Sequence, residues 1–173
     1  MKILEVLWYA LPSFSVCGVP IILARFHILD VLGVPISEKF GSNKTWRGLL
    51  SGMISAIAVT AFQVVLYVHF PVFRKISVVN YLEINPFALG LLFGVGNHAF
   101  DLTKSFFKRR MNKPPGDKFF PWDEFDAFAG VLMSTLIVPL PLDVILWSAI
   151  IIPSATYCGN VFLYHLRVKS VPY

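Results

Sequence analysis

Residues 48–70, GLLSGMISAIAVTAFQVVLYVHF, form an apolar stretch without a single Asp, Glu, Lys or Arg. An α-helix needs roughly 20 apolar residues to cross the hydrocarbon core of a bilayer, where backbone polar groups must be satisfied within the helix. Of the 173 residues, 56% are hydrophobic and only 14% are charged. This composition is too apolar for an ordinary soluble domain. The sequence therefore predicts an integral membrane protein of the all-α class.

Four further apolar stretches accompany this one along the chain. The expected membrane spans are residues 3–24, 48–70, 86–107, 125–142 and 144–166. The loops between them are short, and no internal repeat or second soluble domain is visible. We expect one membrane-embedded domain over residues 1–173, polytopic, with about five transmembrane helices.

The basic residues are divided unevenly between the two sets of loops. Only Lys2, Arg74 and Lys75 of the 15 Lys and Arg are left for the side on which the chain begins. Because basic residues concentrate in cytoplasmic loops, segments 25–47 and 108–124 are expected in the cytoplasm. The N-terminus is then outside and the C-terminus cytoplasmic.

This topology also accounts for the formal net charge of +5. A basic cytoplasmic face attracts anionic lipid head groups. Nucleic acid is therefore not expected as a partner, whereas membrane lipids are.

Charged residues are densest in segment 101–126, which begins at the end of the expected third span. An intramembrane carboxylate such as Asp101 is costly and marks a functional site by default. At helical spacing Asp101, Ser105 and Lys108 share one face. The alternative is that Asp101 pairs with Lys104 or Ser105 and merely satisfies its charge near the interface.

Two more carboxylates lie at the other end of this segment. Asp123 and Asp126 are three residues apart, so their side chains point the same way if a helix starts nearby. Asp123 is also typical of a helix N-cap, with Pro121 and Trp122 before it. Taken alone, this pair favours capping.

The combination of these carboxylates with a basic run indicates a different chemistry. Carboxylate oxygens suit Mg²⁺, which is commonly held by one or two carboxylates together with substrate phosphates. The basic residues Lys108, Arg109 and Arg110 can bind polyphosphate oxygens. The pattern suggests phosphoryl or nucleotidyl transfer.

A second polar cluster, GSNKTWRG at residues 41–48, precedes the expected second span. Lys44 and Arg47 lie at the beginning of that helix, where free backbone N–H groups favour anions. The alternative is a basic anchor with Trp46 at the membrane interface.

These motifs together resemble those of the archaeal CDP-archaeol synthases, relatives of the CDP-diacylglycerol synthases. The resemblance covers about residues 41–130 and rests on KTWRG (44–48), Asp101, SFFKRR (105–110), Pro115-Gly116, Asp123 and Asp126. The chain departs from the wider family at Phe100, where that family has Gly.

The resemblance implies the roles of individual residues. Catalytic roles fall to Asp101, Lys108, Asp123 and Asp126, and the three aspartates would also hold Mg²⁺. Contacts to CTP and to phosphate fall to Lys44, Thr45, Arg47, Ser105, Arg109 and Arg110.

The resemblance also implies the reaction and its partners. CTP and a glycerol-phosphate ether lipid, 2,3-di-O-geranylgeranyl-sn-glycerol 1-phosphate, would give a CDP-activated lipid and pyrophosphate at the cytoplasmic face of the cell membrane. A homodimer is left open. The competing hypothesis is a small ion or solute transporter in which His98 and Asp101 line a path.

Overall fold

The computed structural model describes residues 2–168, and over this range it contains helices and no strand. A single isolated β-bridge joins Pro35 and Thr45 within a loop. Residue 1 and residues 169–173 lie outside the described residues. The C-terminus, which is expected in the cytoplasm, is therefore outside the described part of the chain. The predicted all-α fold is confirmed.

Four helices are long and the other helical segments are short. The long helices are α1 (Lys2–Arg25), α2 (Trp46–His69), α4 (Pro86–Arg110) and α6 (Leu142–His165). The short segments are η1 (Asp30–Leu32), α3 (Pro71–Lys75), η2 (Trp122–Phe125) and α5 (Asp126–Ser134). By length and composition α1, α2 and α6 can each cross a membrane, as the sequence predicts for a membrane protein.

Side chains at the helix starts explain where two of the long helices begin. The Thr45 hydroxyl accepts the Gly48 N–H at 3.2 Å before α2. The Asn85 side chain accepts the N–H groups of Phe87 and Ala88 before α4. Both are N-caps that satisfy otherwise unpaired backbone donors.

The stretch 125–142 is not the continuous spanning helix that the sequence predicts. Helix α5 has nine residues and ends at Ser134, so it is about 14 Å long against about 30 Å for the hydrocarbon core. Turns follow it over residues 135–138, ahead of Pro139 and Pro141. The prediction of one unbroken helix here was wrong.

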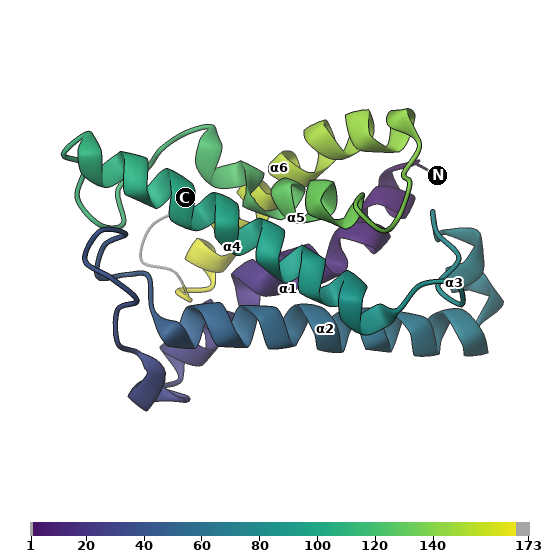
Figure 1. Ribbon diagram of the computed structural model, residues 1–173, viewed down its shortest axis with the longest axis horizontal. Coiled ribbons are helices and arrows are strands. Elements are labelled where there is room, and N and C mark those ends of the chain that lie inside the picture. The colour runs from purple at the N-terminus through teal and green to yellow at the C-terminus, as the bar shows by residue number, and fades with distance from the viewer. Residues whose placement is uncertain (1, 169–173) are drawn as a thin grey trace.

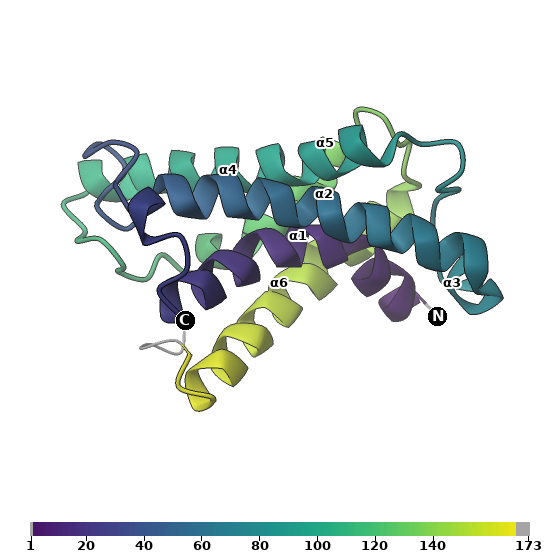
Figure 2. The same cartoon turned by 90° about the horizontal axis from the view of Figure 1, so that it is seen from below.

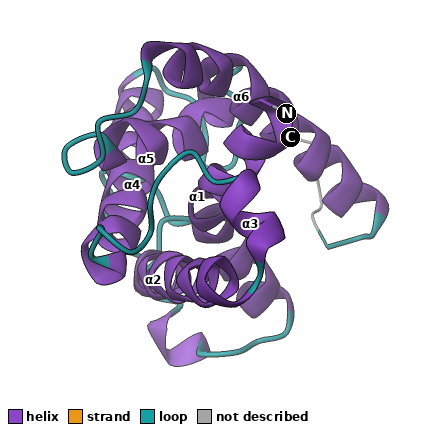
Figure 3. Ribbon diagram, turned by 90° about the vertical axis from the view of Figure 1, so that its right-hand side faces the viewer, coloured by secondary structure: helices purple, strands orange, loops and turns teal. Residues whose placement is uncertain are grey.

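Helix α1 lies in the middle of the molecule, with α2, α4, α5 and α6 packed around it (Figure 3). Close approach depends on glycine at two positions. A Cβ on Gly90 of α4 would come within 2.5 Å of the Ile57 Cα of α2, and a Cβ on Gly130 of α5 would overlap Asn97 of α4. Small residues of this kind let membrane helices pack backbone against backbone.

Buried hydrogen bonds tie α1, α4 and α5 together. The Asn97 amide nitrogen donates to the Ser13 hydroxyl and to the Phe93 carbonyl, both at 3.0 Å. The Tyr9 and Ser134 hydroxyls share a hydrogen bond of 2.8 Å. These bonds fix how the three helices sit against one another.

The connections gather at two opposite ends of the bundle (Figures 1 and 2). The loop between α1 and α2 lies at one end, together with the loop between α4 and α5. Helix α3 and the link from α5 to α6 lie at the other end, where Lys2 and Asp143 form an ion pair of 2.8 Å. The two charged clusters of the sequence therefore meet at the same end.

Candidate active site

A cavity of about 400 Å³ lies among α1, α4, α6 and the loops at this end of the bundle. Its lining includes seven charged side chains from five parts of the chain. They are Lys44, Asp101, Lys104, Lys108, Asp117, Asp123 and Asp126.

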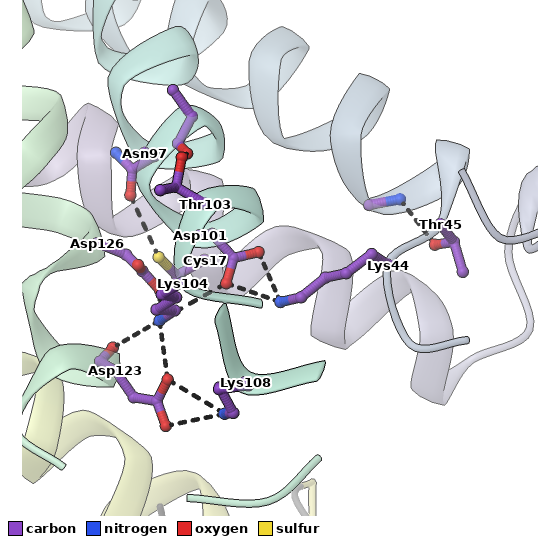
Figure 4. A network of polar contacts seen from close by, with 12 residues as sticks. Cys17, Lys44, Thr45, Asn97, Asp101, Thr103, Lys104, Lys108, Asp123 and Asp126 are labelled. Carbon is purple, nitrogen blue, oxygen red and sulfur yellow. Dashed lines mark hydrogen bonds and ion pairs between the residues drawn. The ribbon is translucent and has the colours of Figure 1, made fainter. Parts of the chain in front are cut away.

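Lys104 lies at the centre of this charged group (Figure 4). Its ammonium nitrogen is 2.6 Å from Asp126 Oδ2, 3.0 Å from Asp123 Oδ1 and 3.6 Å from Asp101 Oδ1. Only 8% of the Lys104 side chain is exposed. Burying a lysine ammonium costs free energy, and its ion pairs with the carboxylates offset that cost.

Lys44 and Lys108 flank the centre on either side. The Lys44 ammonium donates to both oxygens of Asp101, at 2.7 and 2.6 Å, from the turn that precedes α2. Lys108, one turn beyond Lys104 on α4, reaches Asp123 at 3.4 and 3.5 Å. Each outer lysine thus pairs with one carboxylate, and Lys104 joins all three.

Asp123 does not cap helix α5. Its Oδ2 accepts the Phe119 N–H at 2.7 Å, so it closes the turn before η2 and points its other oxygen at Lys104. Partial burial opposes the charged form, but Lys104, the Phe119 amide and Lys108 outweigh it and hold the pKa of Asp123 below its ordinary value. The interpretation of Asp123 as the N-cap of a helix was wrong, and the residue belongs to the carboxylate cluster.

The donor chemistry of this cluster fits a divalent cation of the Mg²⁺ type. Asp126 Oδ1 is buried and accepts no hydrogen bond from the described residues. Over residues 2–168 no set of three His, Cys, Asp or Glu side chains surrounds an open metal position, because the three carboxylates close on the Lys104 ammonium. Carboxylate oxygens are nonetheless the ligands that Mg²⁺ takes, and Mg²⁺ needs only one or two of them with substrate phosphates.

Several residues that the resemblance assigned to phosphate lie away from the cavity lining. Arg47 binds Asp30 Oδ1 at 2.5 Å and so holds the η1 loop. The guanidinium of Arg110 lies 5.2 Å from the ring centre of Phe106, and Ser105 is buried within α4. Arg109 packs near Gly41, with its Nε and Nη1 buried and unpaired among the described residues.

Thr45, by contrast, belongs to the cavity lining and also has a structural role. It caps α2 and also lines the cavity beside Lys44. Of the ten predicted site residues, the cavity therefore brings together Lys44, Thr45, Asp101, Lys108, Asp123 and Asp126.

Lys104 is the site residue that sequence reasoning missed. Its spacing from Asp101 suggested only a local pair, whereas its nearest partners are 19 and 22 residues further along the chain. The signal available was that Lys104 shares a helix face with Asp101 and Lys108. His98 and Thr156 also line the cavity, and each carries a buried polar atom without a hydrogen-bond partner among the described residues.

Fold and site together define a membrane protein that is helical over residues 2–168 and has a cavity lined by lysine and aspartate side chains. The family model described as CarS-like CDP-archaeol synthase matches residues 1–173. The chain belongs to this family, so it is a CTP-dependent cytidylyltransferase, and the predicted enzyme class is confirmed. The competing hypothesis of a transporter has no support from the family.

Individual relatives agree with the family model. A CDP-archaeol synthase of Pyrococcus furiosus is 32% identical over 185 residues, which cover 99% of this chain and 98% of the relative. A CDP-archaeol synthase of Methanosphaerula palustris is 33% identical, with 77% and 80% covered, and one of Thermococcus gammatolerans is 30% identical, with 96% and 94% covered. No solved structure matches the chain significantly.

Proposed function

We propose that this cavity is the active site in which the phosphate of an archaeal glycerol ether lipid reacts with CTP to give the CDP-lipid and pyrophosphate. The observation that carries the proposal is the convergence of three lysines and four carboxylates, three of them ion-paired with the lysines, on one cavity at the end of a membrane helix bundle. The names of the relatives support the product, and the charged lining suits two polyanionic reactants.

In this reaction an oxygen of the lipid phosphate forms a bond to the α-phosphorus of CTP. The bond from that phosphorus to the oxygen bridging the β-phosphate breaks, and pyrophosphate leaves with the electron pair. The attacking phosphate is already an anion, so it needs little help from a general base. Bringing two polyanions together is the harder task, and positioning with charge neutralisation supplies most of the catalysis.

Lys108 is the lysine best placed to bind substrate phosphate. Its contacts with Asp123 at 3.4 and 3.5 Å are long compared with about 2.7–2.9 Å for a strong charge-assisted hydrogen bond. Its donors are therefore incompletely used. Lys44 and Thr45 lie across the cavity at the start of α2, where the helix N-terminus also favours anions.

Asp101, Asp123 and Asp126 would hold Mg²⁺, with Asp126 Oδ1 as an oxygen that accepts no hydrogen bond from the described residues. When bound, the ion would neutralise charge on the phosphoryl oxygens. Arg109 and Arg110 remain candidates for longer-range attraction of phosphate, since both lie in the last turn of α4, next in sequence to Lys108 of the cavity lining. Arg47 and Ser105 are proposed to support the site through the loop and helix that carry it.

We propose that the chain passes the membrane five times, with α5 and the turns after it as the fourth pass. The active site would face the cytoplasm and the N-terminus the outside. The grouping of the two basic loops at one end of the bundle supports this orientation, as does the Lys2–Asp143 ion pair at the opposite end. Helix α4 is about 37 Å long and can bring its charged last turns out to the interface.

The test is a pyrophosphate-release assay on the purified protein in detergent, with CTP, Mg²⁺ and the geranylgeranyl glycerol phosphate. We expect release that requires both substrates and that Asp123→Asn lowers by about 10²-fold or more. Glu38→Gln, an exposed change in the loop before α2, is the matched control and should retain activity. Absence of release by the unaltered protein would refute the reaction, and full activity of Asp123→Asn would refute the site.

A further inference from the structure

The Lys104 ammonium is enclosed by carboxylates from three different segments. Asp101 comes from α4, Asp123 from η2 and Asp126 from the first turn of α5, all within 3.6 Å of the Lys104 nitrogen. The ammonium donates hydrogen bonds to Asp126 Oδ2 and to the Asp123 carbonyl, and it forms ion pairs with the Asp123 and Asp101 carboxylates. A simple counter-ion for Asp101 would have needed one partner only.

A cation held among several carboxylates can do the work of one ion of a two-metal site. In such sites the two ions lie about 3.5–4 Å apart and share carboxylate ligands. Lys104 reaches the same kind of shared position from a rigid helix, with only 8% of its side chain exposed. A second divalent ion placed there would be repelled by the ammonium at short range, where charges interact strongly.

The charges of the cluster also support the interpretation that Lys104 takes the place of a second cation. The three ion-paired aspartates are matched in number by Lys44, Lys104 and Lys108, and Asp117 adds a fourth carboxylate to the cavity lining. The paired cluster attracts a metal ion mainly through its unused oxygens and the phosphates of the nucleotide. Asp126 Oδ1 is the buried carboxylate oxygen of the cluster that lacks a donor among residues 2–168.

We propose that Lys104 is a built-in second cation, so that the site takes one divalent ion per chain together with CTP. The ammonium holds the three carboxylates in place and neutralises charge where other enzymes use a second metal. This inference rests on the proposed function, because it concerns the metal site of that reaction. Lys104 is a positioning residue under this proposal, because its ammonium forms ion pairs with three carboxylates and acts on the reaction through them.

The test counts Mn²⁺ ions bound to the detergent-solubilised protein by electron paramagnetic resonance, with CTP present and the lipid acceptor left out so that no turnover occurs. We expect about one Mn²⁺ per chain in the unaltered protein and about two in Lys104→Gln. Without the ammonium, three aspartates face two lysines, and a second ion relieves the excess negative charge. Lys104→Arg keeps the positive charge and should stay at one ion.

Each contrary result has a separate meaning. Two ions in the unaltered protein would overturn the inference, while pyrophosphate release by the same protein once the lipid acceptor is added would leave the proposed function standing. One ion in a folded Lys104→Gln would likewise overturn it. If Lys104→Gln does not fold, the counts for the unaltered protein and Lys104→Arg decide, since both must be one. No bound ion and no pyrophosphate release would reject the proposed function itself.

Discussion

Replacing Lys44 with glutamine tests whether the loop before α2 belongs to the active site. The change removes an ammonium that donates to both oxygens of Asp101, at 2.7 and 2.6 Å. Glutamine keeps much of the side-chain length and can still donate a hydrogen bond, so the main loss is charge. Lys104, at 3.6 Å, is then the remaining cation beside Asp101.

The expected size of the effect comes from the geometry of this pair. Hydrogen bonds to charged groups contribute about 1.5–3 kcal/mol each. The side chains of Lys44 and Asp101 are each 21% exposed, so the two contacts are partly screened. About 3 kcal/mol is then a reasonable total. If that energy acts on the transition state, kcat/KM falls by roughly 10²-fold, since each 1.36 kcal/mol is tenfold in rate.

The assay is pyrophosphate release over a range of CTP concentrations, with thermal unfolding in detergent as a check on folding. Lys39→Gln removes an exposed lysine from the same loop and should leave kcat/KM within about twofold, because a distant exposed charge is screened by salt. A folded Lys44→Gln protein with kcat/KM within about threefold of the unaltered enzyme would refute the reasoning, since losing about 3 kcal/mol of transition-state stabilisation lowers kcat/KM by much more than threefold.

Three further predictions concern other parts of the structure. Arg47→Gln should reduce kcat/KM by less than Lys44→Gln in the same assay, because Arg47 binds Asp30 outside the cavity. An equal or larger loss of kcat/KM would show that Arg47 takes part in the substrate site. Gly130→Ala should lower the unfolding free energy by about 2–4 kcal/mol through overpacking and a lost buried hydrogen bond, as measured by thermal unfolding, whereas Gly159→Ala, with open space around it, should not. The pKa of the Asp123 carboxyl is lowered in the folded state. The charged carboxylate therefore stabilises the fold fully above the unfolded pKa of about 3.9, and this stabilisation is lost as the pH falls below about 3.9. The difference in unfolding midpoint between the unaltered enzyme and Asp123→Asn should be constant from about pH 5 to 8 and should disappear only under more acid conditions.

Much of the helical organisation could be predicted because it depends on local properties of the chain. The apolar stretches 3–24, 48–70 and 144–166 correspond closely to α1, α2 and α6. Asn85 and Pro86 mark the start of α4 by ordinary capping chemistry. The failure at 125–142 has a physical reason as well, since hydropathy records how apolar a stretch is and not where its helix gives way to turns, as it does after Ser134.

Residue types and their order along the chain determined that this is a helical membrane protein whose carboxylates and basic residues are concentrated in segments 41–48 and 101–126. The same information placed Arg47 at the site and left Lys104 out of it. Only the tertiary structure decided these two positions, because the nearest partners of Lys104 come from η2 and α5 and that of Arg47 from the η1 loop. Such pairings depend on how α1, α4 and α5 pack through Gly130 and Asn97, and a distance between segments cannot be read from spacing within one helix.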